Sequence, residues 1–350
     1  MCEREAWRTG WSIHTPGTLR LRAQELGASV HLIEGLIPAR SNVILLGDSG
    51  LGKSPLVYQA GISIAAGVPF LGRETTRGRV LIADFENGIG DISELVERIS
   101  GYLGLPGPPD DVLLWSLNDC DLRYGQPEHT LLDMLRDVRP ALAIIDSLGS
   151  YDPDAEEKNS SATKMIQEFR LLARDCGTAT TSVHHRRKQS RNKGESTGPL
   201  ETTILRHWFQ DARGASSLVN GSDIRLGVDE PDQSAAAKDE VSLVLRGFGR
   251  MRGEIGPLYL ARDRDENGDP LGYRRLIGSE LLFNEDQRNA LITLSQQFSF
   301  KDAKVAYSRA DQATANFLHH AANLDLIRKL GRGRYEKVAP QNGESDGARG

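Results

Sequence analysis

The feature that most constrains this chain is a glycine-rich octapeptide that begins at residue 47. It reads Gly47-Asp48-Ser49-Gly50-Leu51-Gly52-Lys53-Ser54 and fits the pattern GxxxxGK[ST] at every required position. Chance would produce this pattern only about 0.02 times in a chain of this length. The apolar run 43–46 precedes it, and Leu56, Ala60 and Ile64 follow at helical spacing. The sequence therefore predicts a strand, a tight loop and a helix in that order.

A loop of this kind is suited to hold phosphate groups. Backbone N–H groups of a tight glycine loop and of the helix that follows can surround a phosphate without obstruction by side chains. Lys53 then bridges the β- and γ-phosphates, and the Ser54 hydroxyl ligates Mg²⁺. Pro55 is compatible with this helix start, because N–H groups in the first turn lack an intrahelical partner. We therefore expect residues 47–54 to bind ATP together with Mg²⁺.

Apolar segments of strand length alternate with amphipathic segments beyond this motif. The expected strands cover 79–85, 112–115, 141–146 and 178–184, and the expected helices cover 92–103, 129–137 and 161–176. Continuous apolar strands that alternate with helices indicate a mainly parallel sheet covered on both faces. Further strands are expected at 241–245 and 256–261, with a hairpin turn at 266–269. The predicted fold class is α/β.

The last part of the chain has a different pattern. Helices are expected around 290–298, 303–307 and 313–330, followed by a turn and a short strand at 331–338. Three helices and a β-wing describe a winged helix. We divide the chain into an N-terminal lead-in at 1–35, an α/β domain at 36–280, a winged-helix-like domain at 284–339 and a disordered polar tail at 340–350.

Composition excludes several classes of protein. Lys and Arg total 43 against 48 Asp and Glu, so the net charge is −5 and contact with nucleic acid requires a local basic patch. The three cysteines, Cys2, Cys120 and Cys176, have neither CxxC nor Cys/His ligand spacing, which argues against a disulfide framework or a structural zinc. No apolar run is long enough for a signal peptide or a membrane anchor. We expect a cytoplasmic protein without membrane contact.

Carboxylates follow two of the expected strands. Asp146 ends the apolar run 142–145, and the carboxyl ends of parallel strands face the phosphate crevice, so Asp146 is expected to help hold Mg²⁺. Glu86 follows the strand 80–85 and could orient or deprotonate the attacking water. Asp84 has the same side-chain direction but lies deeper in the strand, which favours Glu86. The alternatives are an ordinary strand-end Asp and a surface charge.

The strand at 178–184 leads into two further candidates. A polar side chain at its end, His184 or His185, can hydrogen-bond the γ-phosphate and report its loss, whereas a structural histidine is the alternative. The segment after it contains five cations and no acid, namely Arg186, Arg187, Lys188, Arg191 and Lys193. Its place after a phosphate-facing strand suggests a mobile loop that contacts a DNA or RNA backbone, and a solvated loop is the alternative.

Together with the segment Asp211-Ala212-Arg213-Gly214-Ala215-Ser216-Ser217-Leu218, these motifs resemble the RecA-like ATPases of the plasmid replicative helicase RepA type. The resemblance extends over about residues 30 to 275 and rests on the order and spacing of five motifs: 47–54, 81–86, 143–147, 183–185 and 211–218. That family forms hexameric rings with ATP at the subunit interfaces. The resemblance implies a RecA-like P-loop core and a homohexamer.

The resemblance also implies roles for single residues. Lys53, Ser54, Glu86 and Asp146 would act within one subunit, and His184 or His185 would be the phosphate sensor. Arg213 would be the arginine finger that reaches a neighbour's γ-phosphate, where a cation stabilises charge on the transferring phosphoryl oxygens. A local salt bridge is the alternative for Arg213.

One departure from the family is the C-terminal segment that begins at about Asn284. Residues 284–339 contain nine Lys or Arg and six Asp or Glu, a balance of 9 − 6 = +3, and such a module could bind duplex DNA or a partner protein. We expect a Mg²⁺-dependent ATPase that works as a ring on single-stranded DNA, as a replicative helicase of a plasmid, phage or other mobile element. The alternative is an ATP-switched DNA-binding or regulatory module without unwinding activity. A small-molecule kinase is disfavoured, because Glu86 and Arg213 suit attack by water and a site shared between subunits.

Overall fold

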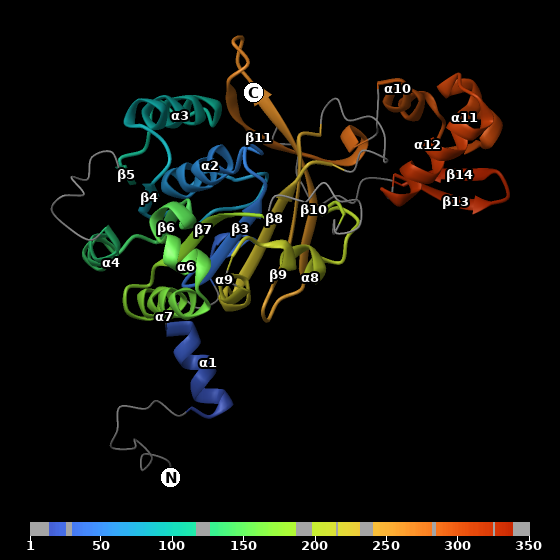
Figure 1. Ribbon diagram of the computed structural model, residues 1–350. Helices are drawn as coiled ribbons and strands as arrows, with labels where there is room; N and C mark the ends of the chain where they lie inside the picture. Colours follow the sequence, from blue (N-terminus) through green and yellow to red (C-terminus); the bar gives the residue numbers. More distant parts are fainter. Residues whose placement is uncertain are drawn as a thin grey trace.

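The computed structural model describes residues 14–25, 30–116, 127–186, 198–214, 216–231, 241–281, 285–324 and 326–338. These residues form a main body around one large sheet and a smaller C-terminal unit (Figure 1). Helices lie on both faces of the sheet, as the alternating pattern of the sequence predicts. The α/β fold class is confirmed.

The large sheet has nine strands in the order β11-β10-β9-β8-β3-β7-β6-β4-β5. Their bounds are β3 (Asn42–Gly47), β4 (Val80–Asp84), β5 (Val112–Ser116), β6 (Leu142–Asp146), β7 (Ala179–His185), β8 (Ile224–Asp229), β9 (Leu243–Gly249), β10 (Glu254–Arg264) and β11 (Pro270–Leu276). The run from β5 to β8 is parallel, and β9, β10 and β11 extend it in antiparallel fashion. The carboxyl ends of β3, β4, β6 and β7 therefore meet at one end of the sheet.

Each face of the sheet has its own apolar core. One core contains α2 (Lys53–Ala66) and α3 (Ile89–Tyr102). The other contains α4 (Pro127–Val138), α5 (Leu148–Tyr151), α6 (Pro153–Glu157), α7 (Asn159–Asp175), α8 (Leu205–Trp208), the 3-10 turn η2 (Phe209–Asp211) and α9 (Ser216–Gly221). Along β3, Val43 and Leu45 join the first core while Ile44 and Leu46 join the second. Both faces are buried, which explains why the strand reads as a continuous apolar run.

The helix after the octapeptide begins at Lys53 and ends at Ala66. Gly52 precedes it with a φ of 90°, a left-handed conformation that glycine adopts without strain. Pro55 lies in the first turn, where it removes no intrahelical hydrogen bond. Gly67 ends the helix in a left-handed conformation, and its N–H donates to the carbonyls of Ile64 and Ser63. The strand, loop and helix predicted from the motif are all present.

The N-terminal part contributes more to the main body than the sequence indicates. The helix α1 (Pro16–Glu25) is exposed along its length, but the short strands β1 (His31–Ile33) and β2 (Ile37–Pro38) pair with each other. Leu32 and Ile33 are buried in the same core as α2. The end of the lead-in therefore packs on the main body, and the boundary predicted at residue 35 stays a prediction. Among the described helices, none has the length and hydrophobicity that a membrane crossing requires.

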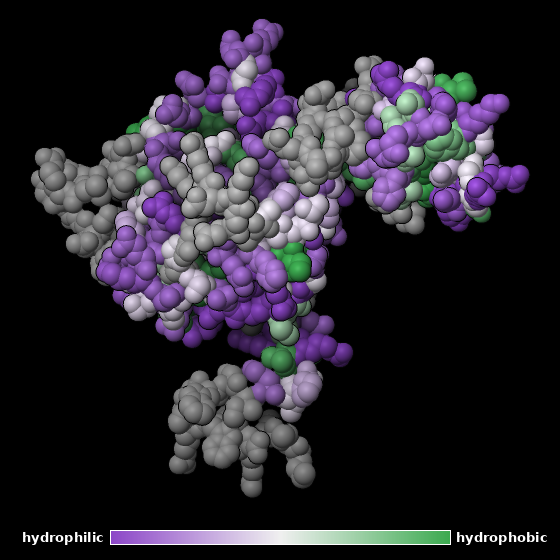
Figure 2. Space-filling model, turned by 45° about the vertical axis from the view of Figure 1, so that its right-hand side comes forward, coloured by the Kyte–Doolittle hydropathy of each residue, from purple (hydrophilic) through white to green (hydrophobic). Residues whose placement is uncertain are grey.

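The 3-10 turn η4 (Gly278–Leu281) precedes a C-terminal unit with its own core, which includes Phe298, Tyr307 and Phe317. Its elements are α10 (Glu285–Thr293), β12 (Gln297–Ser299), α11 (Phe300–Tyr307), α12 (Asp311–Asn323), β13 (Ile327–Gly331) and β14 (Arg334–Lys337), and the sheet order is β12-β14-β13. Figure 2 shows this unit beside the main body, with apolar patches among its polar side chains.

The helix predicted over 313–330 is wrong in its second half. The helix α12 ends at Asn323, and Ile327 begins a strand that pairs with β14. Ile327 is buried in the core of the unit, whereas the four residues after it are exposed. Pairing with a later strand has overridden the local helical spacing. The winged-helix assignment stays a prediction.

Candidate nucleotide-binding site

A cleft of about 320 Å³ opens at the carboxyl ends of β3, β4, β6 and β7. It is lined by Ser49, Gly50, Gly52, Lys53, Ser54, Pro55, Asp84, Glu86, Asn87, Asp91, Ile92, Leu95, Arg98, Asp146, His185 and Pro270. Five of the eight octapeptide residues are among them. The fold brings Lys53, Ser54, Glu86, Asp146 and His185 together from four separate segments of the sequence, as the strand-end argument predicts.

The Lys53 side chain lies inside the loop that precedes it. Its Nζ donates to the carbonyl oxygens of Gly47 at 3.1 Å and of Asp48 at 2.7 Å, and it lies 3.3 Å from His185 Nδ1. The residue is 5% exposed, and burial lowers the pKa of its ammonium group. These contacts fix a cation where the loop becomes α2, which is the place expected for the phosphates of a nucleotide.

Asp146 is buried at the end of β6. Its Oδ2 has no hydrogen-bond partner in the described part of the chain. The pKa of this carboxyl is raised to about 7, mainly by burial; a hydrogen bond with Ser54 opposes the shift, and the charges of Asp84 and Glu86 add to it. Carboxylate and hydroxyl oxygens are the ligands that Mg²⁺ prefers. The unpaired oxygen of Asp146 beside the Ser54 hydroxyl therefore fits a magnesium ion.

Asp84 has a structural task in the turn after β4. It accepts the Tyr58 hydroxyl at 2.7 Å on Oδ2, and its Oδ1 accepts the backbone N–H groups of Glu86 and Asn87 at 2.9 and 2.8 Å. The Asn87 side chain donates a fourth bond at 2.9 Å. Asp84 is 1% exposed. Its oxygens are committed to holding the turn that presents Glu86, which supports the choice of Glu86 over Asp84.

Glu86 lies in the cleft with a 39% exposed side chain. Its Oε1 accepts the hydroxyls of Ser147 and of Ser150, the latter at 3.1 Å, and lies 3.6 Å from His185 Nε2. The hydrogen bond with His185 lowers the pKa of Glu86 to about 2, against the effect of burial. Glu86 is therefore ionised. Because base strength falls with pKa, this environment favours orienting a water over taking its proton.

The two histidines of β7 have different surroundings. His185 approaches both Lys53 and Glu86 in the cleft. His184 is fully buried, and its Nε2 lies 2.7 Å from the carbonyl oxygen of Arg213. Successive side chains of a strand point to opposite faces, which separates the two rings. Of the pair that the sequence left open, His185 is the residue at the cleft, and His184 has no place among the lining residues.

Arg213 follows η2 and lies outside the cleft of its own chain. Its backbone N–H donates to the carbonyl of His185 at 3.0 Å. Its guanidinium pairs with Glu156 at 2.7 Å, although the Arg213 side chain is 62% exposed. The local salt bridge that the sequence allowed is present. The role as an arginine finger stays a prediction, and the exposed side chain leaves the guanidinium accessible.

The prediction that Arg186 contacts DNA is wrong. Its side chain is 2% exposed and lies 3.2 Å from Asp211 and 3.8 Å from Asp229, with the guanidinium stacked over the Trp208 ring at 4.2 Å. The sequence shows a run of cations, but it does not show that the fold places two carboxylates, Asp211 and Asp229, next to Arg186. Arg187, Lys188, Arg191 and Lys193 lie outside the described residues.

One contact that the sequence does not reveal joins the octapeptide to β10 and β11, at the antiparallel edge of the sheet. The Arg262 guanidinium of β10 donates to the Leu51 carbonyl, and the Tyr273 hydroxyl of β11 donates to the Gly52 carbonyl at 2.9 Å. A Cβ on Gly52 would collide with both side chains. No local pattern links these positions, because they lie about two hundred residues apart. Ser147 and Ser150 were also missed, and their only signal is a polar residue type just after the strand that ends in Asp146.

The chain is similar to several known proteins over part of its length. The model of a family described as an AAA domain matches residues 19–191. The DNA repair protein RadA of Mycobacterium tuberculosis, from strains CDC 1551 and H37Rv, is 25% identical over 234 residues, which make up 66% of this chain. The aligned part is 42% of that protein, so the chain spans about two fifths of the length of these relatives. The crystal structure of the RadB recombinase aligns with 68% of this chain and 91% of its own, at 15% identity and a TM-score of 0.42.

Proposed function

We propose that this chain is a RecA-like P-loop ATPase that hydrolyses ATP with Mg²⁺ as one subunit of a ring that acts on single-stranded DNA. The observation that carries the ATPase part is the meeting of Lys53, Ser54, Glu86, Asp146 and His185 in one cleft at the end of a parallel sheet. Cleavage of a phosphoanhydride requires a cation on the phosphates, a metal site and a group that positions water. This cleft contains a residue for each requirement.

The octapeptide and Lys53 bind the triphosphate. Backbone N–H groups of the loop face the phosphates, and the Lys53 ammonium compensates the charge of the β- and γ-phosphates. Ser54 and Asp146 would hold Mg²⁺, which when bound neutralises further phosphate charge. Tyr273 and Arg262 hold the loop carbonyls of Gly52 and Leu51 from outside, so the loop keeps its shape before a nucleotide arrives.

Glu86 positions the water that attacks the γ-phosphate. Ser147 and Ser150 hold one carboxylate oxygen, and the pKa of about 2 keeps the group ionised at neutral pH. His185 lies between Lys53 and Glu86 and is therefore placed to sense the γ-phosphate. We assign the sensor role to His185, while His184 acts through the Arg213 carbonyl as a structural residue.

Ring formation and action on DNA are proposed on further grounds. The five motifs resemble those of RepA-type helicases, and RadA, a relative, is a DNA repair protein by name. An exposed Arg213 at the surface suits a finger that completes a neighbour's site. We propose a homohexamer and a replicative helicase of a plasmid, phage or other mobile element.

A second candidate function is an ATP-switched DNA-binding or regulatory module. The observation in its favour is the C-terminal unit, which has its own core and which we interpret as a winged helix that binds duplex DNA or a partner protein. In such a module the nucleotide would set assembly, and no strands would be separated.

The decisive test is steady-state ATP hydrolysis with and without single-stranded DNA, at two salt concentrations, with oligomer size followed in parallel. A motor should show a salt-sensitive rise in rate and a ring-sized species. The Lys53→Ala protein gives the background. An ATPase that is indifferent to DNA would contradict the motor, and a strand-displacement assay separates the two candidates because only a helicase unwinds a duplex in an ATP-dependent way.

A further inference from the structure

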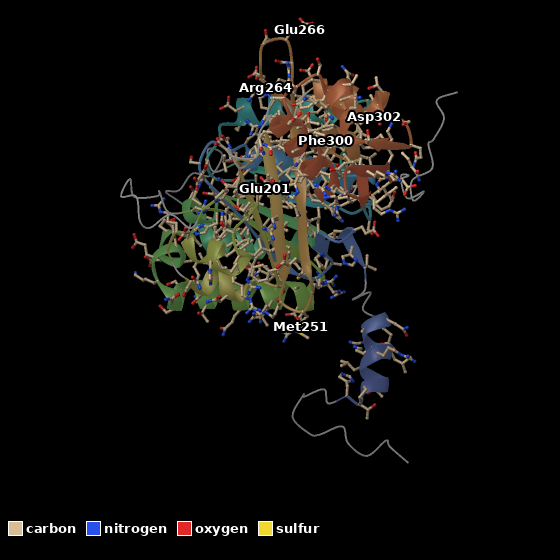
Figure 3. All side chains as sticks on the ribbon, turned by 90° about the vertical axis from the view of Figure 1, so that its right-hand side faces the viewer. Glu201, Met251, Arg264, Glu266, Phe300 and Asp302 are labelled. Atoms are coloured by element: carbon tan, nitrogen blue, oxygen red, sulfur yellow. The ribbon has the colours of Figure 1, made fainter. Side chains whose placement is uncertain are left out.

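The end of the sheet opposite the nucleotide cleft carries two clefts lined by arginine. A cleft of about 470 Å³ lies beside α8, α9 and the end of β9, and one of about 330 Å³ lies beside the C-terminus of α7. The arginines are Arg206, Arg225 and Arg250 in the larger cleft and Arg22, Arg40, Arg170 and Arg174 in the smaller one. We call these seven side chains the basic end. Figure 3 shows nitrogen-tipped side chains near Met251, far from Arg264 and Glu266 at the other end of β10.

The two clefts adjoin each other through two carbonyl groups. The Asn220 carbonyl accepts hydrogen bonds from Arg225 at 3.0 Å and from Arg250 at 2.8 Å. The Gly221 carbonyl accepts from Arg250 at 3.0 Å and from Arg170 at 2.9 Å. Three guanidinium groups therefore converge on the C-terminus of α9. The basic end is one continuous surface rather than two separate pockets.

The positive charge of this surface is balanced in part: in the smaller cleft Arg22 pairs with Glu25 at 3.0 Å and Arg174 pairs with Asp175 at 2.6 Å. Within the described ranges, Arg170, Arg206, Arg225 and Arg250 have no carboxylate within ion-pair distance. Asp223 is the one acid among the residues that line the two clefts, and its Oδ2 accepts the backbone N–H of Asn42 at 3.1 Å.

Arg225 shows the electrostatic cost of placing several guanidinium groups close together. Burial lowers the pKa of its guanidinium, the charge of Arg250 lowers it as well, and the charge of Asp223 opposes the shift. Like charges held together are unfavourable unless an anion lies between them. The whole chain has a net charge of −5, so the concentration of arginine at this end is a local property.

Helix capping explains only part of the cluster. Arg225 and Arg250 donate to the last carbonyls of α9, which stabilises a helix C-terminus. Helix capping does not explain Arg206, whose side chain is exposed and makes no hydrogen bond or ion pair in the part of the chain that the structure describes. Nor does it explain why the β9–β10 turn places Met251, 92% exposed, between Arg250 and Arg252. Exposed cations beside two clefts are suited to an extended anionic ligand.

We propose that the basic end binds the phosphate backbone of DNA, as a contact surface separate from the segment that follows β7. Guanidinium groups bind phosphate oxygens through paired N–H donors, and several such contacts give binding without base readout. The proposal rests on the proposed function only in taking DNA as the polyanion. The two clefts share no lining residue with the nucleotide cleft, so DNA can occupy them without blocking it, although the larger one also reaches Ala212 and Gly214 beside Arg213.

The test is fluorescence anisotropy of a labelled oligo(dT) with the full chain over a series of salt concentrations. Arg206→Glu should weaken binding several-fold and lower the slope of log K against log salt by about one. The double variant Arg206→Glu/Arg170→Glu, which changes both clefts, should lower it by about two. The matched control is Arg264→Glu, which makes the same charge change at the opposite end of β10 and should leave the slope unchanged.

The outcomes separate this proposal from the proposed function. If the unmodified chain does not bind the oligonucleotide, the DNA part of the proposed function fails and this proposal fails with it. If it binds but the double variant has the same slope, the basic end alone is refuted. An equal loss in Arg264→Glu would also refute it, because the effect would then come from overall charge. Should Arg206→Glu lower the melting temperature, Arg206→Gln removes the same charge with less perturbation and decides the matter.

Discussion

Gln59 offers a stringent test of how the sheet supports the octapeptide. Its side-chain amide donates to the Tyr273 carbonyl at 2.9 Å and accepts the Tyr273 backbone N–H at 2.7 Å. β11 is an edge strand of the sheet, so these two backbone groups have no further strand to pair with. Both residues are buried, at 2% and 1% exposure. Gln59 thus takes the place of a neighbouring strand and ties β11 to the helix that follows the octapeptide.

The change Gln59→Leu keeps the side chain's approximate size and removes both partners of Tyr273. A buried backbone group left without a hydrogen bond costs about 1–3 kcal/mol, so two such groups should lower the free energy of unfolding by about 2–6 kcal/mol. The same substitution frees the strand that carries the Tyr273 hydroxyl, which bonds the Gly52 carbonyl. ATP binding should therefore weaken as well.

Urea unfolding followed by tryptophan fluorescence measures this effect without a signal from the C-terminal unit. The four tryptophans are Trp7, Trp11, Trp115 and Trp208, so none belongs to the C-terminal unit. The control is Gln167→Leu, the same change at an exposed position of α7, which should stay within about 0.5 kcal/mol of the unmodified chain. A loss below about 1 kcal/mol for Gln59→Leu, with an unchanged denaturant slope, would show that Gln59 does not stabilise β11 in this way.

Other expectations concern the cleft. Lys53→Ala should abolish ATP hydrolysis at an unchanged melting temperature, and unchanged turnover would overturn the site. His185→Ala should reduce turnover and raise the pKa of Glu86 towards its ordinary value, because the bond with His185 is the largest cause of its low pKa; a pH–rate profile compared with that of His184→Ala checks this. Arg213→Ala should lower turnover without weakening nucleotide binding, and mixing it with Glu86→Gln should restore part of the activity; absence of rescue would count against a shared site.

The α/β class could be predicted because its signals are local. A parallel strand buried on both faces reads as an uninterrupted apolar run, as in Val43 to Leu46, and each helix shows its own apolar spacing. The strand at Ile327 could not be predicted in this way, because its partner, β14, decides its conformation and a helical spacing was available locally. The pairing of β1 with β2 and the burial of Ile33 likewise depend on contacts with the core.

The site shows the same division. Lys53, Glu86, Asp146 and His185 were predictable since each ends a strand or begins a helix, and parallel strands bring such ends together. The environment of each group was not predictable. Nothing in the sequence shows that Ser147 donates a hydrogen bond to Glu86, or that Asp84 accepts the backbone N–H groups of the turn that follows it. The ion pairs of Arg186 with Asp211 and Asp229 are equally invisible in the sequence. Those contacts depend on side chains brought together only by the completed sheet.

The end of β7 connects these contacts into one unit. Three consecutive residues make different contacts. His184 forms a hydrogen bond with the Arg213 carbonyl, His185 lies at the cleft, and Arg186 pairs with Asp211. The Arg213 backbone N–H in turn bonds the His185 carbonyl, so the segment with the proposed finger is held on both sides by the strand with the proposed sensor. Because these two bonds join β7 to the Arg213 segment, a shift of the His185 backbone moves Arg213 unless one of them breaks. These bonds therefore couple the end of β7, where His185 lies at the cleft, to the segment that carries Arg213.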